Sequence, residues 1–151
     1  SFLDAMEGGR AVGVPGLLRM LEAAHREGGR LPWAALIEPT IRLAERGFEV
    51  SPRLAAAIGA TAAALRRDSG ARAYFLDAGG NPHPPGHTLR NEVLANTLRA
   101  VAAEGADALN RGPVATEIAA AVQGGRNPGG MTEADLAAYQ PRRRAVVCQP
   151  Y

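Results

Sequence analysis

The chain contains a single cysteine, Cys148, and no lysine. One cysteine excludes an internal disulfide. All 17 basic residues are therefore arginine, and 15 acidic residues nearly balance them, so the net charge is only +2. This balance gives no electrostatic case for nucleic-acid binding. We attribute the all-arginine usage, together with the abundant alanine and glycine, to a GC-rich coding bias.

Long hydrophobic runs are also missing. No apolar run approaches the roughly 18 residues that a membrane-spanning helix needs. The first ten residues, SFLDAMEGGR, lack the basic-then-apolar order of a signal peptide and begin without methionine. We interpret this start as an internal cut. A chain of 151 residues is long enough to bury a core, and we predict that residues 1–151 form a single helical (sub)domain.

The clearest helical pattern lies in residues 31–50, LPWAALIEPTIRLAERGFEV. Pro32 suits the first turn of a helix, where its missing N–H is not needed. Pro39 removes a hydrogen bond further along and disfavours helical backbone at Glu38. The stretch therefore predicts two short helices with a break at Glu38–Pro39. Their apolar face contains Trp33, Leu36, Ile37, Ile41 and Ala44.

Glycine ends this stretch. Gly47 predicts a left-handed helix cap, after which Phe48 and Val50 fold back onto the core. A helix begins next at Ser51–Pro52, where a hydroxyl cap precedes proline in the first turn.

Further helices are predicted from about Gly16 to Gly28, from Ser51 to Leu65, from Asn91 to Gly105, from Gly112 onwards, and from Thr132, where Asp135 completes a capping box. The helical spacing assigns the following residues to buried faces: Leu17, Leu21 and Ala24; Leu54, Ile58, Thr61 and Leu65; Leu94, Leu98 and Val101; Val114, Ile118, Ala121 and Val122; Leu136 and Tyr139. Arg19, Glu22 and Arg26 fall on the outer side. Short strand-like runs occupy 11–16 and 145–148, and a loop occupies 78–87.

Candidate chemistry is sparse. His83 and His87, with Asp77 nearby, are metal-binding residue types, but their loop-like spacing has no second cluster and favours a structural or solvated role. We interpret His25 as a surface residue and Cys148 as a small buried hydrophobe without a neighbouring His.

Three other features are explained without a functional site. Gly13 and Gly16 precede a helix but match no phosphate-binding motif, so they predict a tight turn. The run 142–144, three arginines, predicts a solvated turn. The carboxylates Asp4, Glu7, Glu38, Asp77, Asp107 and Asp135 form no evident acid–base pair. From the residues alone we predict no catalytic, cofactor-binding or metal site in this chain.

An ordered series of segments resembles the large subunit of γ-glutamyltranspeptidases. These segments are AVGVPGL at 11–17, LPW at 31–33, PTIRLAERGFEV at 39–50, LANTL at 94–98, GPVA at 112–115 and GGMTEADLAAY at 129–139. Three positions depart from the residues usual in that family. They are Thr40, His87 and Leu109–Asn110, and the last of these replaces a usual aromatic pair. The resemblance covers nearly the whole chain in order.

The resemblance implies the helical part of the large subunit of an αββα N-terminal-nucleophile hydrolase. Such a precursor cuts itself, and the new N-terminal Thr of the small subunit attacks a γ-glutamyl amide with its own α-amine as base. Backbone N–H groups stabilise the oxyanion, and a large-subunit Arg pairs with the substrate α-carboxylate. None of these residues maps onto this chain. Thr40, Thr61, Thr88, Thr97, Thr116 and Thr132 occupy helix, strand or cap positions instead.

We therefore predict a fragment of a bacterial γ-glutamyltransferase or glutathione hydrolase, mainly α with five to seven short helices, inactive alone and needing no cofactor or metal. Its implied partners are the rest of the large subunit, the small subunit and a γ-glutamyl substrate bound elsewhere, with no nucleic acid or membrane. The family resemblance implies a periplasmic or secreted enzyme. Two alternatives stay open: a cephalosporin-acylase-like or capsule-polymer transpeptidase member of the superfamily, and a non-catalytic helical interaction module.

Overall fold

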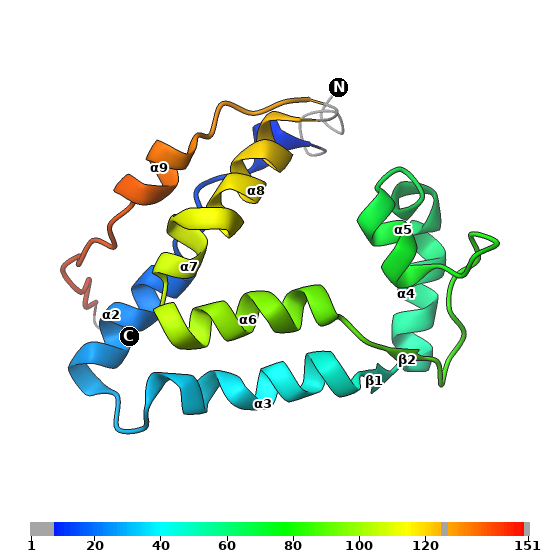
Figure 1. Cartoon of the computed structure of the whole chain (residues 1–151), viewed down its shortest axis with the longest axis horizontal. Coiled ribbons are helices and arrows are strands. Elements are labelled where there is room, and N and C mark those ends of the chain that lie inside the picture. Colours follow the sequence, from blue (N-terminus) through cyan, green and yellow to red (C-terminus); the bar gives the residue numbers. More distant parts are fainter. Residues whose placement is uncertain (1–7, 125–126, 150–151) are drawn as a thin grey trace. The chain divides into compact units, whose positions relative to one another are not determined.

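The computed structural model describes residues 8–124 and 127–149, and these are mainly helical (Figure 1). The elements are η1 (Gly9–Ala11), α2 (Leu17–Gly28), α3 (Trp33–Arg46), β1 (Phe48–Glu49), α4 (Pro52–Leu65), α5 (Ser69–Phe75), β2 (Thr88–Leu89), α6 (Glu92–Glu104), α7 (Asp107–Asn110), α8 (Gly112–Gln123) and α9 (Glu133–Ala138). The mainly α prediction is confirmed. The described residues hold eight α-helices rather than five to seven, because the short helices α5 and α7 carry too little periodic pattern to be recognised.

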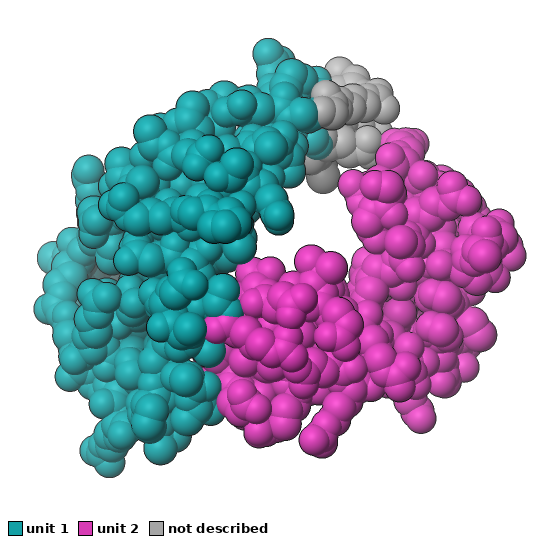
Figure 2. Space-filling model, in the orientation of Figure 1, with its two compact units in different colours: residues 1–36, 100–151 teal, residues 37–99 magenta. Residues whose placement is uncertain are grey.

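Two compact units divide the chain. One contains residues 1–36 and 100–151, and the other contains residues 37–99 (Figure 2). The dividing points fall inside α3 and α6. Each unit is described by itself below.

Unit 37–99 is built around one small apolar core. Val50, Ile58, Ala62, Leu76 and Leu89 are all at most 6% exposed. Val50 directly follows β1, Ile58 and Ala62 lie in α4, Leu76 directly follows α5, and Leu89 lies in β2. The two strands pair antiparallel with Phe48 opposite Leu89 and Glu49 opposite Thr88. This cluster therefore joins a helical hairpin to a minimal sheet.

Side-chain caps define both helices of this hairpin. The Ser51 hydroxyl accepts a 3.1 Å hydrogen bond from the Leu54 N–H, and Pro52 occupies the first turn, as predicted. Asp68 caps α5 by accepting a 2.7 Å bond from the Ala71 N–H. No helix was predicted between Leu65 and Asn91, so α5 is an element that the sequence pattern missed.

The predicted break at Pro39 is wrong. Helix α3 runs without interruption from Trp33 to Arg46 with Pro39 inside it. Proline still removes one hydrogen bond, but interactions beyond the helix itself offset that loss. In unit 37–99 the Ala44 carbonyl accepts a 2.8 Å bond from the Asn91 N–H, and Glu45 forms an ion pair with Arg99.

Gly47 ends α3 as expected. Its φ of +81° is left-handed, and a Cβ there would lie 2.4 Å from the Leu89 carbonyl oxygen. Val50 is 1% exposed, as predicted, but Phe48 is 41% exposed and does not return to the core.

Unit 1–36 with 100–151 has a second core on α8 and α9. Ala115, Ala119, Val122, Met131 and Leu136 are buried. Asn110, the last residue of α7, is 1% exposed and donates a 2.7 Å hydrogen bond from Nδ2 to the Leu136 carbonyl. Thr132 and Asp135 form the predicted capping box at the start of α9.

Helix α2 turns Arg19 and Glu22 inward in place of the predicted leucines, whereas Arg26 is exposed as predicted. Arg19 and Glu22 are only 13% exposed as side chains, whereas Leu17 is 64% exposed and Leu21 43%. Arg19 forms an ion pair with Asp107, and Glu22 accepts a 3.4 Å bond from the Ala106 N–H at the start of α7. Charge pairing with α7, which lies far along the chain, decides which face of α2 turns inward.

Other face assignments shift by one residue. The pattern assigned Thr61 and Leu94 to buried faces, but the neighbouring alanines Ala62 and Ala95 are buried instead. Leu36, Ala24 and Ala121 are exposed. Small alanine side chains allow close backbone approach, which a hydrophobicity pattern undervalues.

Neither predicted strand outside β1 and β2 forms. Residues 11–16 contain the end of η1 and irregular backbone, and residues 145–148 belong to no helix or strand. Val146 and Val147 are 84% and 85% exposed. Among the described residues, no helix is both long and apolar enough to span a membrane.

Candidate functional site

The loop of residues 78–87, here called the histidine loop, brings together the candidate residues His83 and His87. Their rings stack at a centroid distance of 3.7 Å with an interplanar angle of 3°. The loop is fastened at both ends by backbone hydrogen bonds. His83 N–H donates to the Phe75 carbonyl, and His87 accepts from the Val50 N–H.

Asp77 shapes the start of this loop. Its carboxylate accepts a 2.8 Å bond from the Asn81 N–H, and its main chain bonds Gly80 and Asn81. The Asn81 backbone bond is the largest cause that lowers the pKa of Asp77. The carboxylate is therefore an acceptor that closes a turn.

The geometry does not suit a metal ion. No group of three or more His, Cys, Asp or Glu in the described residues could hold one. The lone pairs of two parallel imidazoles lie in their ring planes and run side by side, so they do not converge on one ion. Burial is the main cause that lowers the pKa of His83, the charge of His87 adds to it, and Asp77 opposes both.

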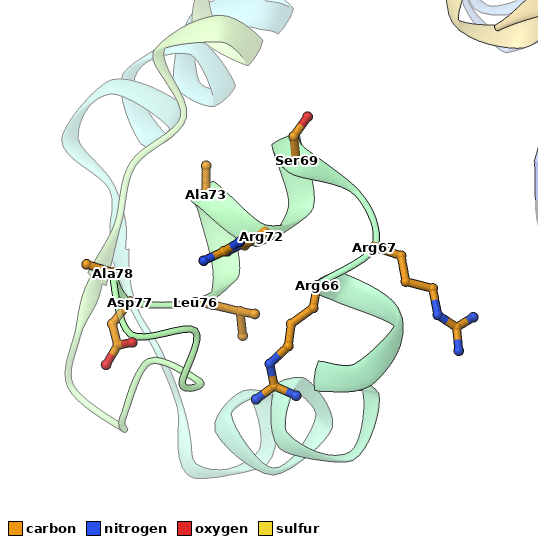
Figure 3. Close-up of a pocket in the computed structure, with 8 residues that line it drawn as sticks. All are labelled: Arg66, Arg67, Ser69, Arg72, Ala73, Leu76, Asp77 and Ala78. Atoms are coloured by element: carbon orange, nitrogen blue, oxygen red, sulfur yellow. The ribbon is translucent and has the colours of Figure 1, made fainter. Parts of the chain in front are cut away.

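A hollow of about 430 Å³ adjoins the histidine loop, and the sequence analysis did not identify it (Figure 3). It is lined by Arg66, Arg67, Ser69, Arg72, Ala73, Leu76, Asp77 and Ala78. Arg66 is already engaged, because its Nε and Nη2 donate to the Gly80 carbonyl at 3.0 and 2.8 Å. In Figure 3 the Arg67 side chain extends away from the other labelled groups. The lining is basic but holds no nucleophile paired with a base.

The remaining candidates are structural or exposed. Gly16 precedes α2 at a close approach, since a Cβ there would lie 2.2 Å from the Tyr139 ring. His25 is half-buried rather than a surface residue, with Nε2 2.8 Å from the Leu31 carbonyl and its ring edge-on to Trp33. Cys148 is exposed, so the prediction of a buried thiol is wrong.

The arginine run 142–144 is solvent-facing, and Arg143 forms an ion pair with Glu27. The predicted solvated segment is thereby refined to one that touches α2.

The threonine hydroxyls of the described residues have structural hydrogen-bond partners where a partner is seen. Thr61, Thr97 and Thr116 bond carbonyls of their own helices, and Thr132 caps α9. Thr40 and Thr88 lie in α3 and β2, as expected. Across residues 8–124 and 127–149, no Ser, Thr or Cys is hydrogen-bonded to a histidine. The described residues therefore show no hydroxyl or thiol paired with a histidine base.

Comparisons with known proteins show which family the chain resembles. A family model described as gamma-glutamyltranspeptidase matches residues 3–151. The acylase ACY 1 proenzyme of Pseudomonas sp. (strain SE83) is 40% identical over 95% of this chain and 25% of its own length. The glutathione hydrolase proenzyme of Bacillus subtilis (strain 168) is 38% identical over 91% of this chain and 23% of its own length.

A solved structure has the same fold. The γ-glutamyltranspeptidase of Helicobacter pylori superimposes with a TM-score of 0.83 at 31% identity, covering 90% of this chain and 38% of that one. The chain spans about a quarter of the length of the curated relatives that it matches.

Proposed function

Because the chain belongs to the γ-glutamyltranspeptidase family, we propose that it is the helical part of the large subunit of a precursor that hydrolyses or transfers the γ-glutamyl group of glutathione and related compounds. The observation that carries this proposal is the family match over residues 3–151. The 38% identity to a glutathione hydrolase proenzyme supports the choice of substrate.

The chemistry belongs to segments other than this one. A Thr freed by self-cleavage attacks the γ-glutamyl amide, and its own α-amine takes the hydroxyl proton and gives it to the leaving amine as the C–N bond breaks. The resulting acyl-enzyme then passes the glutamyl group to water or to another amine. Nothing in the described residues duplicates that arrangement. The described helices contribute by packing, and the isolated chain is inactive.

Two exposed features fit a partnership with the rest of such a precursor. The outward face of α2 presents Leu17, Met20 and Leu21 at 43–64% exposure. Residues 145–148 belong to no helix or strand and include two exposed valines. Apolar surface that is exposed to water is unfavourable unless it is covered. We propose that other segments of the precursor cover them.

Expression of the complete open reading frame tests the function. We expect a precursor that cleaves itself into two chains and releases the chromophore from a γ-glutamyl anilide, whereas the 151-residue chain does neither. An uncleaved full-length protein without γ-glutamyl turnover would contradict the proposal and favour a non-catalytic helical module. Turnover by the 151-residue chain alone would contradict the assignment of the chemistry to other segments.

One observation favours a second function. The acylase ACY 1 proenzyme, at 40% identity, is at least as similar to the chain as the glutathione hydrolase. The full-length protein should therefore also be assayed for deacylation of a cephalosporin. A higher kcat/KM for the cephalosporin than for the γ-glutamyl anilide would replace the first proposal by the acylase, because kcat/KM compares transition-state binding of two substrates directly.

A further inference from the structure

We propose that His83 and His87 form a pH-sensitive latch, in which protonation of both rings releases the histidine loop from the core of unit 37–99. This inference is independent of the enzyme function proposed above. It rests on the stacked ring pair and on where the loop is attached.

The stack holds the two rings face to face. Two imidazoles lie parallel at 3.7 Å, and no hydrogen bond ties either ring to another side chain among the described residues. One protonated ring can share the stack with a neutral one. Two protonated rings place like charges 3.7 Å apart, and even at the dielectric constant of bulk water that repulsion shifts an equilibrium about sixfold.

The surrounding charges leave this repulsion largely uncompensated. Two charged groups bond the loop: Asp77, just after α5, bonds Asn81, and Arg66, just after α4, bonds the Gly80 carbonyl. Asp77 favours the protonated form of His83, but its carboxylate is already held by Asn81. Arg66 adds positive charge at the Gly80 carbonyl.

The sign of the pH effect follows from linkage. The pKa of His83 is lowered in the folded chain, mainly by burial and then by His87. The unfolded chain therefore takes up its proton first as the pH falls. The stabilisation is complete above the ordinary histidine pKa of about 6.5 and is lost as the pH falls through the lower folded value.

The loop is fastened directly to the core. Gly86 donates a 2.8 Å bond to the Val50 carbonyl, and the Val50 N–H donates a 2.8 Å bond to the His87 carbonyl. Val50 is 1% exposed and packs in the cluster with Leu76 and Leu89. Separation of the rings is therefore expected to weaken the two hydrogen bonds between the loop and the Val50 backbone.

Amide hydrogen exchange in the 151-residue chain tests the latch. The readout is the protection factor, that is, the exchange rate of an unstructured peptide at the same pH divided by the measured rate. We expect the protection of the Val50 and Gly86 amides to fall by up to about sixfold from pH 7.5 to pH 5.0. The amide of Ala55, which bonds the Ser51 carbonyl in α4 of the same unit, should keep its protection.

Variants separate the ring pair from burial alone. His87→Gln removes one charge, so the fall at Val50 and Gly86 should become smaller than in the parent chain, while the part caused by burial of His83 remains. His25→Gln is the matched control, because His25 lies in the other unit, and it should leave the fall unchanged. Equal protection at both pH values in the parent chain, or an undiminished fall in His87→Gln, would overturn the latch. So would a uniform fall that includes Ala55, which would indicate global acid unfolding.

Discussion

Asn110 is the sharpest test of how unit 1–36 with 100–151 is held together. Its side chain is 1% exposed and joins α7 to α9 through a 2.7 Å hydrogen bond to the Leu136 carbonyl. In Asn110→Ala that carbonyl keeps only a 3.4 Å bond from the Tyr139 N–H. Loss of a buried hydrogen bond whose partner stays buried costs about 1–3 kcal/mol.

Trp33 provides the assay, because it is the single tryptophan and lies in the same unit. Its indole N–H donates a 2.8 Å bond to the Val101 carbonyl, so its fluorescence reports on unfolding around it. With a urea dependence of about 2 kcal/mol per molar, a loss of about 2 kcal/mol lowers the urea midpoint by about 1 M.

Asn96→Ala is the matched control. Asn96 is exposed and bonds only Arg99, so its truncation should change the free energy of unfolding by less than about 0.5 kcal/mol. Equal midpoints for the Asn110 and Asn96 variants would refute the role of the buried amide.

Asn110→Asp extends the same reasoning to pH. A buried carboxylate cannot donate to the Leu136 carbonyl, so this variant should lose more stability at pH 7 than Asn110→Ala. Burial raises the pKa of such a carboxyl, and protonation restores a donor. Relative to the parent chain, the variant should recover stability as the pH falls toward 4, and a deficit that is constant with pH would argue against this.

Three further predictions concern the helices. Thr132→Ala should lower the free energy of unfolding by about 1 kcal/mol, because it breaks the capping box. Hydrogen bonds from Thr132 lower the pKa of Asp135. The stabilisation by that carboxylate is therefore present above pH 4 and is lost as the pH falls through its folded pKa. Gly59→Ala, in open space within α4, should stabilise the folded chain by up to about 1 kcal/mol, whereas Gly47→Ala should destabilise it because of the positive φ and the close approach to β2. The urea midpoints of the two variants should shift in opposite directions. A shift in the same direction would contradict the backbone argument. Pro39→Ala should stabilise α3 by restoring its missing hydrogen bond, seen as a higher melting temperature by circular dichroism, and an unchanged or lower value would mean that the helix is already adapted to proline.

The predictable parts of the fold were those fixed within a few residues. The Ser51 cap, the left-handed Gly47 and the Thr132–Asp135 box each depend on backbone groups three or fewer positions away. Asn91 likewise caps α6 by accepting from the Leu94 N–H. Such signals need no knowledge of the rest of the chain.

The candidate site was predictable only in part. His83, His87 and Asp77 were identified as neighbours in one loop, and the structural interpretation of Asp77 agrees with its turn. The parallel ring stack and the hollow beside Arg66 and Arg72 were not foreseen. They depend on how the loop folds back on α4 and α5, which no spacing in the sequence specifies.

The sequence by itself determined the mainly helical class, most helix ends and the absence of a recognisable catalytic motif, because caps, glycines and prolines act locally on the backbone. Tertiary structure decided that α3 passes through Pro39 and that α2 turns Arg19 and Glu22 inward, and residues 145–148 have no strand partner among the described residues. For α2 and α3 the outcome depends on groups distant in the chain. The free energy of such a contact exceeds the preference of a single turn, so local pattern gave way to packing.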